Sequence, residues 1–147
     1  MIHWTYKNYT DLTTDELYQI LSLRSKVFVV EQNCVYQDLD NKDQECWHLL
    51  GYINDTLVAY VRLLPPGLSY AEASIGRVIT HPDYRQKGYG IALMQLAIEK
   101  ANIQFSTQKL KISAQCYLIN FYESFGFKIL GVEYLEDGIP HIEMILN

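Results

Sequence analysis

The sequence predicts an α/β domain built around one mixed β-sheet. Segments with strand-like alternation flank segments with helical periodicity, short turns link three consecutive strands, and a strand–helix–strand unit follows them. Short turns join antiparallel strands, whereas a strand–helix–strand unit joins parallel ones, so both arrangements should meet in one sheet. Of the 147 residues, 49% are hydrophobic and 20% are charged, and we expect a single domain over residues 1–147.

The N-terminal part is expected to supply one strand and one long helix. Residues 2–6 alternate apolar and polar side chains, which indicates a strand. Thr13 and Glu16 fit a capping box, in which each side chain satisfies a backbone N–H of the first helical turn. An apolar stripe at helical spacing extends this helix to about Val30. The Asn- and Asp-rich segment 31–45 favours turns, and it could either line a substrate site or form a solvated loop.

The middle of the chain is expected to form an antiparallel meander. Residues 47–53 and 56–64 have strand character and are joined by a tight Asn-Asp turn. The Pro-Pro-Gly sequence at 65–67 ends the second strand, because proline cannot donate a hydrogen bond to a neighbouring strand. The next strand is expected at residues 71–80, and an apolar, largely buried helix should begin near Tyr89.

The C-terminal part is expected to add a parallel strand, a short helix and a hairpin. The strand at 109–114 follows a strand and a helix, which is the order of a parallel crossover. A short helix is expected at 118–124. The last two strands are expected at 127–134 and 141–146, joined by a turn over residues 136–140 that contains an Asp-Gly pair.

Composition narrows the functional classes. The net charge of −5 does not suggest nucleic-acid binding, and no apolar run approaches the roughly 20 residues that cross a bilayer. Met1 leads into strand-like sequence without the features of a signal peptide, so we expect a cytoplasmic protein. Cys34, Cys46 and Cys116 lack zinc-knuckle and C-x-x-C spacing and are expected to be free thiols. We therefore expect no metal, no nucleic acid and no membrane among the partners.

The connection between the strand at 71–80 and the following helix could bind phosphate. It reads Arg85-Gln86-Lys87-Gly88-Tyr89-Gly90 and ends at a helix N-terminus, where backbone N–H groups and the helix dipole favour an anion. The connection lacks the Gly-Lys-Ser/Thr of a P-loop and the third glycine of the dinucleotide fingerprint. Taken alone, the pattern fits a flexible connection equally well.

A second motif gives this connection its context. The motif is aromatic-rich and reads Asn120-Phe121-Tyr122-Glu123-Ser124-Phe125-Gly126-Phe127. Together with Arg77–Gly90, it resembles the two cofactor motifs of the GNAT superfamily of acyl-CoA-dependent N-acetyltransferases, over almost the whole chain. Residues 27–33, 36–38 and 136–141 resemble the ElaA branch of that superfamily. The resemblance implies a twisted, mostly antiparallel sheet with a central splayed pair of parallel strands, flanked by helices.

The resemblance also implies acetyl-CoA as the co-substrate. The pantetheine arm would pair with the strand before the glycine connection, in an opening between the two splayed strands. The pyrophosphate would lie on backbone N–H groups of the connection, whose glycines allow close approach because they lack a Cβ. Asn120 would order the cofactor arm, or it could cap the short helix. The expected cofactor-binding residues are Val78, Ile79, Thr80, Arg85, Gln86, Lys87, Gly88, Tyr89, Gly90 and Asn120.

The implied reaction moves an acetyl group from the thioester directly to a primary amine of a small molecule or peptide. Tyr122 stands where the family carries its general acid, and a phenol with a pKa near 10 suits protonation of a thiolate. Tyr122 could instead be an aromatic core residue. The sequence does not single out a base, and water-relayed deprotonation would need none. The candidate bases are Glu31, Glu72, His81, Glu136 and His141.

Arg77, Glu136 and His141 are the candidates for substrate binding. A charge inside a strand needs a partner or a wet cleft, so Arg77 could bind a substrate carboxylate or pair with a nearby acid. The alternative function is a regulatory module that binds acyl-CoA without turnover, but such a module would not need Tyr122 as an acid. The aromatic C-terminal strands could support a homodimer, or they could only complete the sheet.

Overall fold

The computed structural model describes every residue from Met1 to Asn147. Seven strands and three α-helices form the fold, with short 3₁₀ turns between several of them. The strands are β1 (His3–Asn8), β2 (Trp47–Ile53), β3 (Thr56–Leu64), β4 (Ala73–Thr80), β5 (Leu110–Gln115), β6 (Lys128–Glu136) and β7 (Ile139–Leu146). The helices are α1 (Thr14–Arg24), α2 (Tyr89–Gln104) and α3 (Ile119–Glu123).

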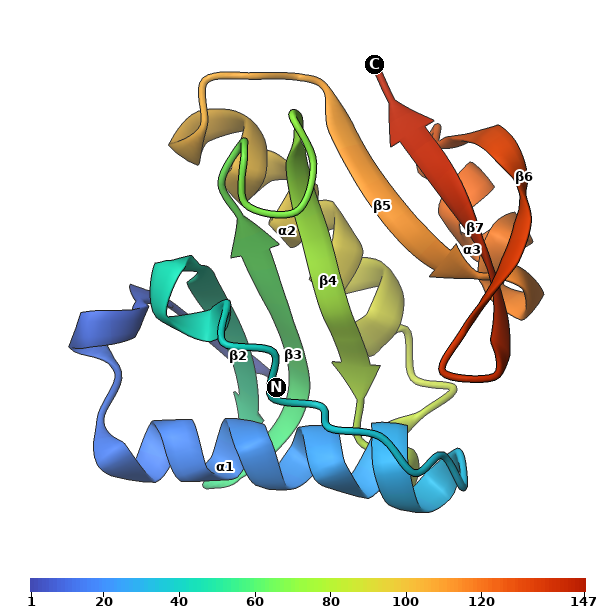
Figure 1. Ribbon diagram of the computed structural model, residues 1–147. Helices are drawn as coiled ribbons and strands as arrows, with labels where there is room; N and C mark the ends of the chain where they lie inside the picture. Colours follow the sequence, from blue (N-terminus) through green and yellow to red (C-terminus); the bar gives the residue numbers. More distant parts are fainter.

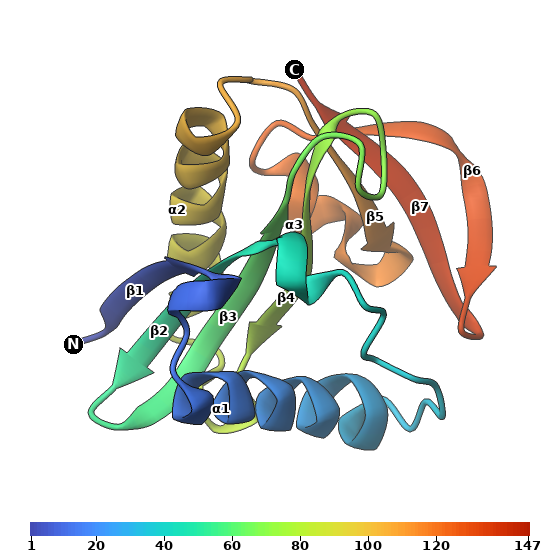
Figure 2. The same ribbon diagram turned by 60° about the vertical axis from the view of Figure 1, so that its left-hand side comes forward.

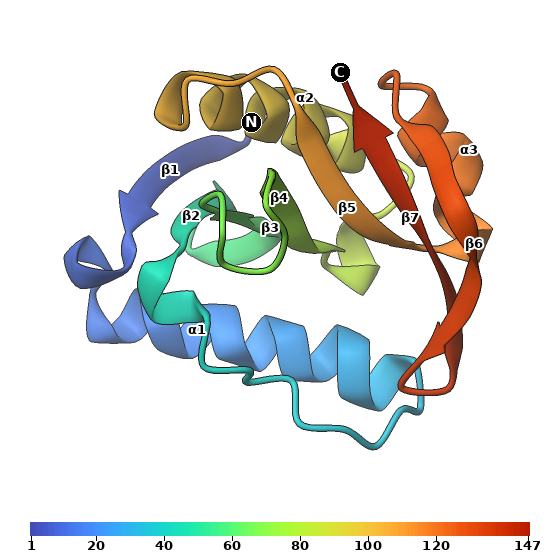
Figure 3. The same ribbon diagram turned by 45° about the horizontal axis from the view of Figure 1, so that its top comes forward.

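All seven strands belong to one sheet with the order β1-β2-β3-β4-β5-β7-β6. Every neighbouring pair is antiparallel except β4 and β5, which are parallel and are connected through α2. Helices α1 and α2 lie on opposite faces of the β2–β4 half, and α3 lies near β5 and β7 (Figures 1 and 3). The predicted mixed sheet with one central parallel pair is therefore confirmed.

Helix α1 begins as the capping box predicts and continues as a π-helical segment over Ser25–Glu31. The Thr13 hydroxyl accepts from the Glu16 N–H at 3.0 Å, and the Glu16 carboxylate accepts from the Thr13 N–H at 2.8 Å. At the other end, the Gln32 N–H reaches the Val27 carbonyl five residues back. The helical stretch thus has the expected length, although its last turns are wider than an α-helix.

Apolar side chains pack on both faces of the sheet. The larger cluster lies between the sheet and α2 with α3, and the smaller one lies between the sheet and α1. Figure 2 shows α1 and α2 on either side of the sheet. The expectation that α2 is largely buried is only partly right, because Ile91 and Ile103 on its outer face are 50% and 72% exposed. One face of α2 is enough to cover this part of the sheet. That face carries Leu93, Met94, Ala97 and Ala101.

The C-terminal hairpin is tighter than the sequence predicts. Strand β6 extends to Glu136 and β7 begins at Ile139, so that only Asp137 and Gly138 form the turn. Both turn residues have positive φ angles, 52° and 78°, and this conformation lets two residues reverse the chain. Pro140 is tolerated in β7 because it lies beyond the end of β5, where no β5 carbonyl needs its missing N–H.

Strand β6 is an edge of the sheet and leaves apolar side chains in solvent. Val132 is 81% exposed and Leu135 is 71% exposed. A homodimer through this hairpin stays a prediction. No helix in the structure combines the length and the apolar character that a membrane crossing requires.

Candidate functional site

A cavity of about 960 Å³ opens between β4 and β5. The two strands are paired only at Ala73–Leu110 and Ser74–Lys111, and then they diverge (Figure 1). From Ile75 to Thr80, β4 therefore has no strand partner on the side of β5. Backbone groups along such an edge can bind an extended ligand as they would bind another strand. This is the V-shaped opening that the family resemblance implies.

A β-bulge shapes the β4 wall of the cavity. Tyr60 pairs with Ile79 and Arg62 pairs with Gly76, so that two residues of β4 lie opposite one residue of β3. Arg77 in this bulge has a φ of 53°, a left-handed conformation that side chains other than glycine seldom adopt. Because a bulge bends and twists its strand, it helps to turn β4 away from β5. The cavity is lined beyond the bulge by Val78, Ile79 and Thr80.

The connection before α2 forms the second wall. Gly88 is the N-cap of α2 and has a φ of 80°, which glycine adopts without strain. No heavy atom lies within 4 Å of where a Cβ on Gly88 would be, so the backbone is open on that side. No side chain caps α2, and the N–H groups of its first turn remain available to an anion. The lining residues from this connection are Arg85, Gln86, Gly88, Tyr89 and Gly90.

Two predicted cofactor residues do not line the cavity. The Lys87 ammonium lies 5.9 Å from the centre of the Tyr84 ring, outside the lining. Asn120 is exposed on α3, and its backbone carbonyl accepts from the Ser124 N–H. Their contact with a cofactor stays a prediction.

Arg85 lines the cavity but is already paired. Its guanidinium makes a bidentate ion pair with Glu31, at 2.6 and 2.7 Å, and its Nε donates to the Thr80 carbonyl at 3.2 Å. The hydrogen bonds from Arg85 lower the pKa of Glu31 below its ordinary value. The pair fastens the glycine connection to the end of the π-helical segment.

Tyr122 belongs both to the core and to the cavity. It is 7% exposed, and its ring packs edge-on against Phe121 and Phe127. Its hydroxyl makes no hydrogen bond within the protein, and the residue lines the cavity. Burial raises its pKa above the ordinary value near 10, so the phenol keeps its proton at neutral pH. This is the state that a general acid requires.

The register of β5 and β7 separates two faces of the site. Gln115 lies opposite His141, so these two side chains share one face of the sheet. Ala114 and Ile142 lie opposite each other and pack with Tyr122 in the core on the other face. Tyr122 and His141 therefore line one cavity from opposite faces of the sheet.

The irregular segment after α1 forms the wall on the His141 face. Its start is fixed by paired Gln32 and Gln115 amides, at 3.2 and 3.3 Å, and by the Cys34 thiol, which donates to the Asp137 carbonyl at 3.2 Å. These contacts carry the chain from the end of α1 to the tip of the β6–β7 hairpin (Figure 3). Of the two readings of segment 31–45, the structure supports the one that lines a site, since Tyr36, Gln37 and Lys42 line the cavity.

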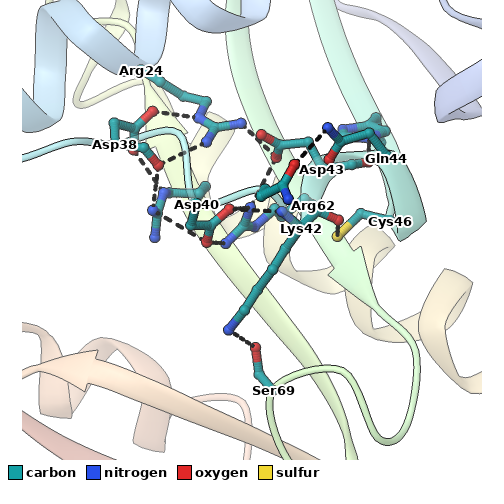
Figure 4. Close-up of polar contacts among 12 residues, drawn as sticks. Arg24, Asp38, Asp40, Lys42, Asp43, Gln44, Cys46, Arg62 and Ser69 are labelled. Atoms are coloured by element: carbon teal, nitrogen blue, oxygen red, sulfur yellow. Dashed lines mark hydrogen bonds and ion pairs between the residues drawn. The ribbon is translucent and has the colours of Figure 1, made fainter.

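The rest of this segment is held by a network of three arginines and three aspartates (Figure 4). Arg24 of α1 donates from Nε to Asp38 at 2.8 Å and from Nη1 to Asp43 at 2.7 Å. Arg62 of β3 donates to Asp43 at 2.9 Å and also to Asp40. Arg77 of β4 donates from Nε to Asp38 at 2.7 Å. We call these six residues the arginine–aspartate network.

In this network Arg77 pairs with a nearby acid. Arg77 also lines the cavity, so its binding of a substrate carboxylate stays a prediction. Burial would raise the pKa of Asp40 and Asp43, but hydrogen bonds from the arginines hold both values below the ordinary one. Arg24 and Arg62 were not singled out from the sequence. The sequence feature that could have identified them is a charged residue within an apolar segment. Arg24 lies inside an apolar helical stripe and Arg62 inside an apolar strand, and the same feature identified Arg77.

The five candidate bases differ in their hydrogen-bond partners and in whether they line the cavity. Glu31 is paired with Arg85, Glu72 lies outside the cavity, and the His81 ring accepts from the Asp83 N–H at 3.1 Å. Glu136 and His141 remain, and both line the cavity. No three His, Cys, Asp or Glu side chains gather where they could hold a metal ion, and Cys34, Cys46 and Cys116 are free thiols.

Comparison with known proteins identifies the family of this chain. A model of the acetyltransferase (GNAT) domain matches residues 10–147 of the chain. The chain belongs to the GNAT acetyltransferase family. As a GNAT protein it is an acyltransferase.

Relatives over the full length place this GNAT protein near ElaA. A UPF0039 protein of Schizosaccharomyces pombe is 46% identical over 99% of this chain and 97% of its own. Protein ElaA of Escherichia coli is 42% identical over 98% and 95%. The crystal structure of ElaA superposes with a TM-score of 0.92, at 41% identity over 99% of both chains. That of an acyl-CoA N-acyltransferase from Pseudomonas aeruginosa gives 0.94, at 40% identity over 99% of both chains.

Proposed function

We propose that this GNAT acyltransferase moves the acetyl group of acetyl-CoA directly to a primary amine of a small molecule or peptide. One observation carries the proposal: the unpaired edge of β4, the uncapped N-terminus of α2 and the free hydroxyl of Tyr122 line the same cavity. The P. aeruginosa relative is described as an acyl-CoA N-acyltransferase, which supports an acyl-CoA donor.

The cofactor would be held mainly by backbone groups. Its pantetheine arm would pair with β4 at Val78, Ile79 and Thr80, where β5 is absent. Its pyrophosphate would accept hydrogen bonds from the N–H groups around Gly88 and Gly90 at the start of α2. Arg85 is already paired with Glu31, so we assign it a secondary share of the anion binding.

The chemical step would begin with attack of the neutral amine on the thioester carbonyl. The carbonyl oxygen gains negative charge as the tetrahedral intermediate forms, and a strand N–H near Val78 would donate to it. The C–S bond then breaks, and Tyr122 gives its proton to the leaving thiolate. Because burial raises the pKa of Tyr122, the phenol stays protonated until the thiolate forms.

The amine would approach from the face opposite Tyr122. That side of the cavity is formed by the segment after α1 and by polar residues of β5 and β7. The arginines of the arginine–aspartate network are matched by its aspartates, so they offer little free positive charge to a substrate. Glu136 and Asp137 lie at the hairpin end of the same cavity and suit a cationic group.

A screen of primary amines and short peptides tests the proposal. Release of free CoA thiol from acetyl-CoA is followed in the presence of each amine, and the acetylated product is identified by mass spectrometry. We expect amine-dependent release with formation of an amide. Tight binding of acetyl-CoA without thiol release for any amine would support the regulatory module instead.

A further inference from the structure

The geometry around His141 points to a further catalytic residue. Its Nδ1 lies 2.7 Å from the Ile139 carbonyl oxygen, and a carbonyl can only accept, so Nδ1 carries a hydrogen. In the neutral ring, Nε2 then has a free lone pair. Nε2 lies 3.4 Å from a carboxylate oxygen of Glu136, which is also an acceptor. When the ring is neutral, two acceptors therefore face each other, and an ammonium or an added proton would satisfy both.

The surroundings of His141 fix its ring at the cavity wall. The side chain is 8% exposed, and the Tyr134 ring stacks on it at a centroid distance of 6.2 Å. Tyr134 is held in turn by a short hydrogen bond to Ser113. With Nδ1 bound to the backbone, Nε2 is the only ring nitrogen free to exchange a proton.

We propose that His141 is the general base of the amine acceptor and that Glu136 binds the acceptor's ammonium group beside it. This inference rests on the proposed function and adds the group that removes the proton. Base and acid then stand on opposite faces of the sheet, with the thioester between His141 and Tyr122.

The proton balance uses both groups. An ammonium R–NH₃⁺ loses one proton to Nε2 of His141, and the resulting amine forms the new C–N bond to the thioester carbon. When the C–S bond breaks, Tyr122 protonates the thiolate, and the second proton of the nitrogen returns to the Tyr122 phenolate. His141 finally releases its proton to solvent. The products are the amide, CoA as a thiol and one proton.

The charges near His141 fit this role. While the imidazole is protonated, the Glu136 carboxylate at 3.4 Å stabilises it as an ion pair. The positive charge of Lys111 on the same face is paired with Glu143 at 3.5 Å. Tyr134 of β6 stacks on the ring. The titratable and polar residues that share the cavity lining with His141 include Tyr70 of the β3–β4 connection, Ser113 and Gln115 of β5, Glu136 of β6, Asp137 of the turn and Cys34 of the segment after α1.

The test compares two small nucleophiles whose protonation differs. Ethylamine is almost fully protonated at neutral pH and needs a base, whereas hydroxylamine is largely unprotonated and needs much less help. Thiol release from acetyl-CoA is measured with each nucleophile for the wild type, His141→Gln, His141→Ala and a control, His3→Gln on the exposed surface of β1. Calorimetric titration with acetyl-CoA checks that each variant still folds and binds.

We expect His141→Gln to lower kcat with ethylamine by about 100-fold and with hydroxylamine by less than about 10-fold. Added imidazole should restore His141→Ala, and His3→Gln should match the wild type.

If the wild type is active, either of two results would overturn the assignment of His141 without affecting the proposed function. The first is an unchanged rate with ethylamine in His141→Gln. The second is an equal loss of rate with both nucleophiles, together with no rescue of His141→Ala by imidazole. A wild type that binds acetyl-CoA but releases no thiol with ethylamine, hydroxylamine or any amine of the screen would overturn the proposed function, and the base with it.

Discussion

Replacing Arg24 with methionine should lower the free energy of unfolding by about 3 kcal/mol. Arg24 is completely buried and ties Asp38 and Asp43 to α1 through bonds of 2.8 and 2.7 Å. Methionine fills much of the same volume but removes the charge. Both carboxylates would stay buried, since the Asp38 and Asp43 side chains are only 5% and 10% exposed.

The expected loss in the free energy of unfolding depends on the ion pairs that each aspartate retains. Removing one partner of a buried ion pair typically costs about 3–5 kcal/mol, because the other charge is left without compensation. Asp38 still has Arg77 and Asp43 still has Arg62, so we expect the lower end of that range. For a chain of this length, the loss corresponds to a fall in Tm of about 10 °C.

Urea denaturation followed by circular dichroism measures this change. The control is Lys7→Met, which removes a surface ion pair with Glu16 at 3.0 Å and should cost less than about 1 kcal/mol. An Arg24→Met protein no less stable than the Lys7→Met protein would refute the view that the arginine–aspartate network holds the segment after α1 in place.

Three further predictions concern the cofactor, the acid and pH. Gly88→Val should weaken acetyl-CoA binding at least about 10-fold in a calorimetric titration, because a φ of 80° strains valine and its side chain fills the open space. Gly131→Val, with a φ of 89° on β6 and equally open space, should bind normally, and equal affinity of the two variants would contradict the loop assignment. Tyr122→Phe should lower turnover about 100-fold with little change in affinity, and wild-type turnover would remove its role as acid. The pKa values of Asp40 and Asp43 are lower in the folded than in the unfolded chain, so stability in urea should be constant near neutral pH and fall as the pH drops below about 4. Equal stability at pH 7 and pH 3 would argue against this contribution.

Local signals predicted most of the fold. The strands of the meander and the capping box of α1 depend on alternation, turn residues and caps within a few residues, and the structure agrees with them. The hairpin turn was predicted too long, since β7 begins at Ile139 and includes Pro140. Its tolerance in β7 depends on where β5 ends, which is a property of the sheet and not of the local sequence.

In the candidate site, too, features set by local sequence were predicted and features set by the tertiary structure were not. The glycine connection before α2 is contiguous in sequence and was predicted as a unit. The arginine–aspartate network joins residues between 14 and 39 positions apart, in a segment without periodicity, and could not be predicted from spacing. The candidate bases could be sorted only after the register of β6 and β7 had placed His141 beside Glu136.

The central claim is that the cavity between β4 and β5 uses acetyl-CoA to acetylate a primary amine. Its most direct test is incubation of the protein and an amine with acetyl-CoA that carries an isotopic label in the acetyl group. Free CoA thiol and labelled amide are then measured in the same sample. We predict that they form in equal amounts and only when the amine is present. Firm binding of acetyl-CoA with neither product would contradict the account.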